Sequence, residues 1–144
     1  MKIVIDTNVI FSALYSKNGA SHRLLVWLFE SQEKHSVVSN TLALEYEDVL
    51  MRHENRRYYR HLEQQDLARF IDDLCLISYH QKVHFLWRPF LKDMNDDMVL
   101  EVAVNAGAKA IVTFNPKDFS GVPEKFGIDI LTPKAFLQQQ GVTA

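Results

Sequence analysis

The chain has 144 residues, of which 47% are hydrophobic and 24% charged, a composition typical of one soluble globular domain. Its formal net charge of −2 excludes a general attraction to nucleic acid, so a bound polyanion would need a local basic patch or a protein-held cation. No apolar run is as long as a membrane span, and the first residues lack the layout of a signal peptide, so we expect a cytoplasmic protein.

Short apolar strands alternate with helices along the chain. Strands are predicted at residues 1–5, 36–39, 110–113 and 128–131, and helices at residues 7–15, 21–31, 41–52, 63–76, 96–106 and 133–140, with residues 77–85 ambiguous. Ser21 is the predicted N-cap of the second helix, Asn40 or Thr41 caps the third, and Gly107 ends the fifth. This pattern predicts an α/β three-layer sandwich, in which helices flank a central parallel sheet of four to five strands.

A carboxylate follows the first predicted strand directly. Asp6 comes immediately after the apolar run Ile3-Val4-Ile5, which places it at the carboxyl end of a buried strand. Ligands of open parallel sheets bind at that edge. An acid there is costly unless a positive charge shares the site, so the question for the rest of the sequence is whether other acids join Asp6.

Glu45 is the next candidate acid. On a helical wheel it lies beside Leu42 and Val49, at the edge of the apolar arc of the third helix. Glu45 could equally be a boundary acid on a solvated helix face.

Two further acidic motifs open a helix and follow a strand. In the run 93–97, Asp97 shares a helix face with Leu100 and Val104, although three acids there also suit a helix N-terminus. Asp118 follows the 110–113 strand, although it could be an ordinary turn residue after Pro116. An acidic, oxygen-rich pocket is a site for a hard divalent cation, which cancels repulsion among acids and phosphate and generates hydroxide.

The ordered set of Asp6-Thr7-Asn8, Glu45, Asp97 and Thr113-x-Asn115-x-x-Asp118 resembles the PIN domain, in particular the VapC-like toxin components of bacterial toxin–antitoxin pairs. The resemblance covers residues 1 to about 133 and implies a metal-dependent ribonuclease that forms one domain over residues 1–144. It implies Mg²⁺ or Mn²⁺ as cofactor, and RNA, an antitoxin protein and a second copy of the chain as partners. It assigns catalytic and metal-binding roles to Asp6, Glu45, Asp97 and Asp118, and supporting roles to Thr7, Asn8, Ser39, Asp93, Asp96, Thr113 and Asn115. Two departures from the family pattern are Asn115, where many members have Asp, and Met94, where relatives often have Pro.

One basic stretch, residues 52–61, could bind RNA. Its arginines could contact phosphate and its tyrosines could stack on unpaired bases, or the stretch could be a solvated loop with its rings tucked against the core. The predicted RNA-binding residues are Arg52, Arg56, Arg57 and Arg60.

Other chemically notable residues predict packing or surface roles. Cys75, the only cysteine, excludes an internal disulfide, and its apolar neighbours predict a place in the core. His80 and His84 have a metal-ligand spacing but lack a third soft ligand, so we expect neither to bind metal. Core or dimer-surface roles are predicted for Phe11, Leu14, Tyr15, Phe85, Trp87 and Phe90.

Two other classes of function remain open. An acid-pocket phosphatase or phospho-acceptor domain also places Asp after its first strand, but dehalogenase-like enzymes need a second Asp where Asn8 stands. A receiver domain would need a lysine near a later strand end, and Lys117 comes only after Pro116. A degenerate PIN fold that binds RNA or protein without catalysis is kept open by Asn115.

Overall fold

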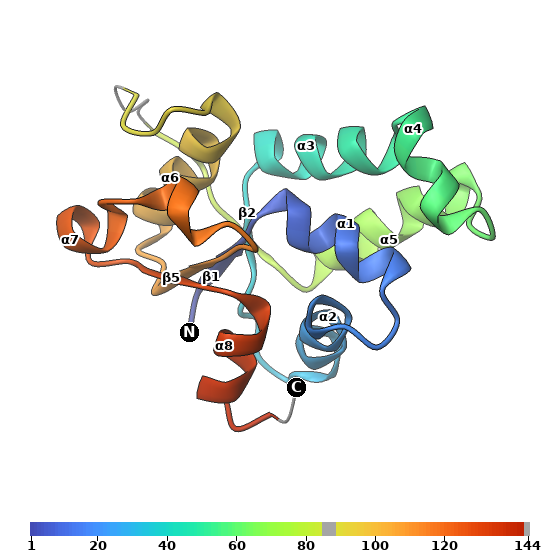
Figure 1. Cartoon of the computed structure of the whole chain (residues 1–144), viewed down its shortest axis with the longest axis horizontal. Coiled ribbons are helices and arrows are strands. Elements are labelled where there is room, and N and C mark those ends of the chain that lie inside the picture. The colour runs from blue at the N-terminus through green and yellow to red at the C-terminus, as the bar shows by residue number, and fades with distance from the viewer. Residues whose placement is uncertain (85–88, 143–144) are drawn as a thin grey trace.

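The computed structural model describes residues 1–84 and 89–142, and Figure 1 shows its arrangement of strands and helices. Phe85 and Trp87, predicted to pack in the core or a dimer surface, lie outside the described residues. The strands are β1 (Ile3–Ile5), β2 (Val37–Val38), β3 (Tyr79–His80), β4 (Ala110–Val112) and β5 (Asp129–Leu131). The α-helices are α1 (Thr7–Tyr15), α2 (Ala20–Glu30), α3 (Asn40–Met51), α4 (His53–Arg56), α5 (Gln64–Leu76), α6 (Met94–Ala106), α7 (Val122–Phe126) and α8 (Pro133–Gln139), and the 3-10 helices are η1 (Arg57–Tyr59) and η2 (Pro116–Phe119).

All described strand pairs are parallel, as predicted. Strands β1, β4 and β5 form one sheet in the order β1-β4-β5, and β2 pairs with β3. A single parallel bridge between Ile3 and Ser36 joins the two parts, so the overall order is β3-β2-β1-β4-β5. Helices α1, α3 and α5 gather on one side of the strands and α6 and α7 on the other (Figure 1). The predicted α/β fold with a flanked parallel sheet is therefore confirmed, with the sheet split into three and two strands.

The strand order creates a reversal between β1 and β4. From β1 the chain moves to β2 and β3 on one side, then crosses back to β4 on the other side of β1. In open α/β sheets the crevice outside the carboxyl ends of two such strands is the usual ligand site. Asp6 follows β1 and Thr113 follows β4, in register with each other across the pair, because Ile5 is paired with Val112. The fold therefore places Asp6 and Thr113 at this switch point.

Two predicted helix caps are wrong. Gly19, not Ser21, precedes α2, and the buried Ser21 hydroxyl donates to Ser12 Oγ. Helix α3 is capped by Ser39, whose Oγ accepts a hydrogen bond from Leu42 N at 3.0 Å. Serine fits the cap because its hydroxyl satisfies an N–H that has no partner within the first turn.

Helix α6 begins two residues before its predicted start. Asp93 is the N-cap, and its Oδ1 accepts a hydrogen bond from Asn95 N at 2.7 Å. The predicted glycine end is confirmed, since Gly107 adopts a φ of 62°, which a residue with a side chain adopts only under strain. Because the helix starts at Met94, both Asp96 and Asp97 lie in its first turn.

The short elements β3, α4, η1, η2 and α7 were not predicted as such. Each spans two to five residues, too few for a helical or strand period to show in the sequence. Within the described residues, no helix is long and apolar enough to cross a membrane. Cys75 is partly buried against the core, as expected, and burial raises the pKa of its thiol.

Candidate functional site

Asp6 is held at the switch point by hydrogen bonds to both carboxylate oxygens. It caps α1, with Oδ1 accepting from Thr7 N at 2.9 Å, while Oδ2 accepts from Thr113 Oγ1 at 2.7 Å. Asp6 is only 9% exposed. Burial raises its pKa above the ordinary value, the two hydrogen bonds lower it, and the charges of Asp118 and Asp93 raise it again. The site thus holds Asp6 in one orientation in spite of the cost of burying its charge.

Thr113 connects Asp6 to the segment that follows β4. Its fully buried hydroxyl donates to Asp6 and accepts a hydrogen bond from Asn115 N at 3.1 Å. Asn8 Oδ1 accepts a longer hydrogen bond from Phe114 N at 3.4 Å. Asn115 precedes η2, and its carbonyl accepts from Asp118 N at 3.0 Å. These contacts place Asn8, Thr113 and Asn115 where they orient the acids, and Thr7 joins them through its backbone N–H.

Asp96 is the acid of α6 that is most affected by the other carboxylates. Its pKa rises from 3.8 to about 7, first because of partial burial and then because of the charges of Asp6, Asp93, Asp118 and Asp97. Like-charged carboxylates raise one another's pKa when no cation lies between them. Asp96 therefore belongs to the electrostatic cluster around Asp6.

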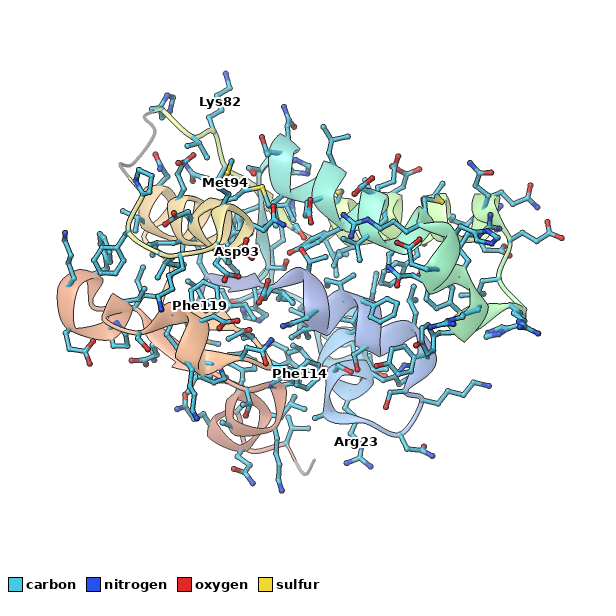
Figure 2. The ribbon with its side chains drawn as sticks, turned by 45° about the horizontal axis from the view of Figure 1, so that its top comes forward. Arg23, Lys82, Asp93, Met94, Phe114 and Phe119 are labelled. Carbon is cyan, nitrogen blue, oxygen red and sulfur yellow. The ribbon has the colours of Figure 1, made fainter. Side chains whose placement is uncertain are left out.

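A cavity of about 380 Å³ lies beside this cluster. Asp93, Asp96 and Asp118 line it together with Lys92 and Lys117. In the view of Figure 2, Asp93 lies between Met94, at the start of α6, and Phe119, at the end of η2. No described residue donates a hydrogen bond to the side chain of Asp118, and none forms an ion pair with either lysine. The cavity therefore offers carboxylate oxygens and two unpaired cations to a ligand.

Asp97 has a different set of contacts from Asp96. Its Oδ1 accepts hydrogen bonds from Phe90 N at 3.1 Å and from Leu91 N at 2.9 Å. Asp97 also lines a separate cavity, together with Ser39. Asp97 therefore holds the 90–91 wall of the acidic cavity through its Oδ1, whereas Asp96 lines that cavity.

Glu45 lies at the margin of the cluster. Partial burial raises its pKa, Arg52 lowers it, and Asp48, Asp93 and Asp6 raise it. Asp93 and Asp6 therefore act on Glu45 electrostatically, but Glu45 does not line the acidic cavity.

Two groups of the site were missed from the sequence. The buried Tyr46 hydroxyl donates to the carbonyl oxygen of Ile5, which ties α3 to the residue before Asp6. The sequence signal that could have identified Tyr46 is a tyrosine on an apolar helix face, because its buried hydroxyl needs a hydrogen-bond partner. The second group is Lys92 and Lys117, for which adjacency to Asp93 and Asp118 is the only signal.

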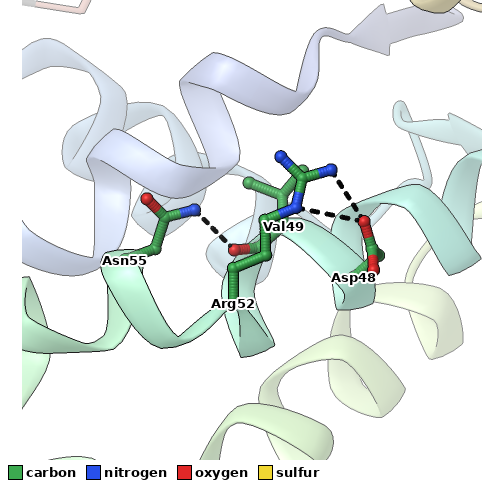
Figure 3. Close-up of polar contacts among 4 residues, drawn as sticks. All are labelled: Asp48, Val49, Arg52 and Asn55. Carbon is green, nitrogen blue, oxygen red and sulfur yellow. Dashed lines mark hydrogen bonds and ion pairs between the residues drawn. The ribbon is translucent and has the colours of Figure 1, made fainter.

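The predicted RNA-binding arginines do not line the acidic cavity. Arg52 directs Nε and Nη2 at one carboxylate oxygen of Asp48, at 3.2 and 2.8 Å, while Asn55 donates to the Val49 carbonyl (Figure 3). Arg56, Arg57 and Arg60 line a different cavity from the acids.

Among the predicted packing and non-ligand residues that the structure describes, Phe90 lines the acidic cavity, whereas Phe11, Leu14, Tyr15, His80 and His84 do not. His80 Nε2 lies 2.9 Å from the Cys75 carbonyl oxygen. Phe90 packs edge-on against Phe126, and Phe11 and Leu14 pack partly buried against the core.

The carboxylate oxygens of these acids are of the kind that binds a hard divalent cation, but as placed they are too far apart to hold one together. Within residues 1–84 and 89–142, no three His, Cys, Asp or Glu side chains are close enough to hold a metal ion as placed. The acids raise the pKa of Asp6 and Asp96, and a shared cation would remove that repulsion. Oxygen-only ligation is the chemistry of Mg²⁺ and Mn²⁺. The chemistry of these residues therefore fits such an ion.

Comparison with known proteins gives one family match. The family described as the PIN domain matches residues 2–117, which include every acid of the site except Asp118. No curated protein matches the chain.

Proposed function

Because the chain belongs to the PIN-domain family, we propose that it is a divalent-metal-dependent endoribonuclease that hydrolyses RNA phosphodiester bonds. PIN domains are typically nucleases and generally use a divalent metal. The observation that carries the proposal is the cavity that Asp93, Asp96 and Asp118 line together, where the charges of Asp93 and Asp118 raise the pKa of both Asp6 and Asp96. Such a cluster is stable with a cation and repulsive without one.

We assign metal binding to Asp6, Asp96 and Asp118, with Asp93 and Glu45 at the margin. When bound, Mg²⁺ or Mn²⁺ would neutralise the acids and the phosphate and lower the pKa of water. Thr113 keeps Asp6 in its orientation through the hydroxyl that it donates to Oδ2. Asp97 remains a predicted ligand, but its Oδ1 is engaged by two backbone N–H groups.

The other residues of the cavity have roles in binding phosphate and moving protons. Lys92 and Lys117, which directly precede Asp93 and Asp118 in the sequence, line the cavity, and each can place its ammonium against a phosphate oxygen. The Asp118 carboxylate, which no described donor engages, can accept the proton of the attacking water. Asp97 holds one wall of the cavity in place, because its carboxylate accepts hydrogen bonds from the backbone of Phe90 and Leu91.

Cleavage of a labelled RNA pool tests the proposal. Purified protein with Mg²⁺ or Mn²⁺ should cleave the RNA, chelation should stop it, and Asp6→Asn should abolish it without loss of folding. Asp129→Asn is the matched control, because this exposed Asp begins β5, at the sheet edge opposite the site. Metal-independent cleavage, or full activity of Asp6→Asn, would refute the assignment. Specific RNA binding with no cleavage under any metal would favour the non-catalytic alternative.

A toxin role is a further proposal, which rests on the resemblance to VapC-like toxins. Under it, residues 1–144 form one nuclease domain that acts as a homodimer, and an antitoxin protein restrains its ribonuclease activity. Induced expression in a bacterial host should then arrest growth, and Asp6→Asn should not. Growth arrest by the Asp6→Asn variant at equal expression would separate toxicity from the acidic site.

A further inference from the structure

A second site, built from residues of α1, α4 and η1, combines exposed aromatic rings with arginines. We call it the basic–aromatic surface, and it consists of Tyr15, Arg56, Arg57, Tyr58 and Arg60. The Tyr15 and Tyr58 rings are 45% and 49% exposed, and their centroids lie 5.4 Å apart. None of these residues lines the acidic cavity.

The exposed rings of Tyr15 and Tyr58 both pack against Phe11. Phe11 contacts Tyr15 and Tyr58 edge to face, at centroid distances of 5.1 and 5.7 Å. The neighbouring Tyr59 is fully buried, and its hydroxyl donates to the Leu50 carbonyl oxygen at 2.8 Å. These contacts hold the rings at the surface before any ligand binds, which lowers the entropic cost of stacking a ligand on them.

The arginines of the surface are available for an anion. The Arg57 guanidinium lies 5.0 Å from the Tyr58 ring centroid and donates to the Tyr58 hydroxyl at 3.2 Å. Arg56, Arg57 and Arg60 line a cavity of about 620 Å³ and form no ion pair with any described residue. Arg52, by contrast, is paired with Asp48.

Helix α1 connects this surface to the acidic site. It is capped by Asp6 and ends at Tyr15, so the two residues are separated by about 14 Å along the helix axis. Helix α3 likewise starts at the sheet edge, beside Ser39, and leads into α4 (Figure 1). A chain bound at the acids can therefore continue along α1 to the basic–aromatic surface.

We propose that the basic–aromatic surface binds single-stranded RNA next to the cleavage site, with Tyr15 and Tyr58 stacking on bases and the three arginines contacting phosphates. The inference rests on the proposed ribonuclease function for its choice of RNA as the ligand. Flat, half-exposed rings beside guanidinium groups suit unpaired bases, which a duplex keeps stacked on each other. An acidic protein would use the arginines but would gain little from two half-exposed aromatic rings.

Binding measured without metal tests the surface independently of cleavage. Fluorescence anisotropy with a labelled single-stranded RNA, in chelator, gives the affinity and its salt dependence. Arg56→Ala with Arg57→Ala should weaken binding and flatten the slope of log affinity against log salt by about 1.4. Tyr58→Leu should weaken binding about tenfold, whereas Tyr58→Phe, which keeps the ring, should bind nearly as the parent does. Arg23→Ala, an exposed arginine of α2 outside the surface, is the matched charge control.

The outcomes separate this inference from the proposed function. RNA binding that depends on the basic–aromatic surface, without cleavage in Mn²⁺, would overturn the ribonuclease proposal but support the surface as an RNA-binding site. Unchanged affinity and salt slope in the double variant, with thermal melting confirming its fold, would overturn the surface whether or not RNA is cleaved. Equal binding of a duplex and a single strand would also overturn it. Tighter binding of a polyglutamate peptide through the same arginines would assign the surface to an acidic protein instead.

Discussion

Exchanging Asp96 for Asn should stabilise the metal-free protein and at the same time weaken metal binding. A rise in pKa from 3.8 to about 7 corresponds to about 4 kcal/mol for a fully buried charge. Because Asp96 is only partly buried and water screens its neighbours, we expect a gain of about 1 kcal/mol in the free energy of unfolding near pH 8. Most substitutions at a structural position are destabilising, so a gain in stability would show that the Asp96 charge is unfavourable in the fold, through its partial burial and through repulsion by the other acids.

The adjacent substitution Asp97→Asn is the matched control. Its amide oxygen can still accept hydrogen bonds from Phe90 N and Leu91 N, but a neutral acceptor is weaker than a carboxylate. We therefore expect Asp97→Asn to lose up to about 1 kcal/mol of stability, the opposite sign from Asp96→Asn.

Urea denaturation in chelator and thermal melting with added Mn²⁺ measure both effects. The parent and Asp97→Asn should gain melting temperature on addition of Mn²⁺, since an ion that binds only the folded state stabilises it. Asp96→Asn should lose most of this gain. If Asp96→Asn responds to Mn²⁺ like the parent and Asp97→Asn does not, then Asp97 is the ligand, as its position on the helical wheel suggested. The proposed exchange of roles would then be wrong.

Three further predictions concern two groups that position Asp6, Thr113 and Tyr46, and the pH dependence of stability. Thr113→Val should cost about 1.5–3 kcal/mol in urea denaturation because it removes a hydrogen bond to a buried carboxylate, while Thr113→Ser should lose less; equal losses would mean that the hydroxyl does not matter. Tyr46→Phe should cost about 1 kcal/mol and lower the cleavage rate more than RNA affinity, because it frees the strand end that carries Asp6; an unchanged rate would limit Tyr46 to stability. The raised pKa values of Asp6 and Asp96 mean that both carboxyl groups bind protons more tightly in the folded protein than in the unfolded chain. Their contribution to stability is present below about pH 4 and is lost as pH rises, for Asp96 through its pKa of about 7. Melting temperatures of the metal-free protein should show that decline over this range, and saturating Mg²⁺ or Mn²⁺ should reduce it; a decline that is the same with and without metal would argue against a cation at these acids.

Much of the fold could be predicted because it depends on local patterns. Three or four apolar residues between helical stretches identify β1 and β4, and strand ends then place Asp6 and Thr113 at one sheet edge. The two-residue strand β3 had no such pattern, since Tyr79 and His80 are both exposed. It forms through pairing with β2, a contact between segments some forty residues apart.

The sequence by itself determined the α/β class, Asp6 at the end of the first strand, and a group of acids in need of a cation. Only the tertiary structure decided which acids face one another. Asp96 and Asp97 are neighbours in the chain but differ by about 100° around the helix axis, so the packing of α6 and the backbone of residues 90–91 give them different contacts. The contact from Thr113 to Asp6 spans 107 residues and exists because β4 pairs with β1. Periodicity reports which side of one element is apolar, but it carries no information about the polar group that a distant element brings to that side.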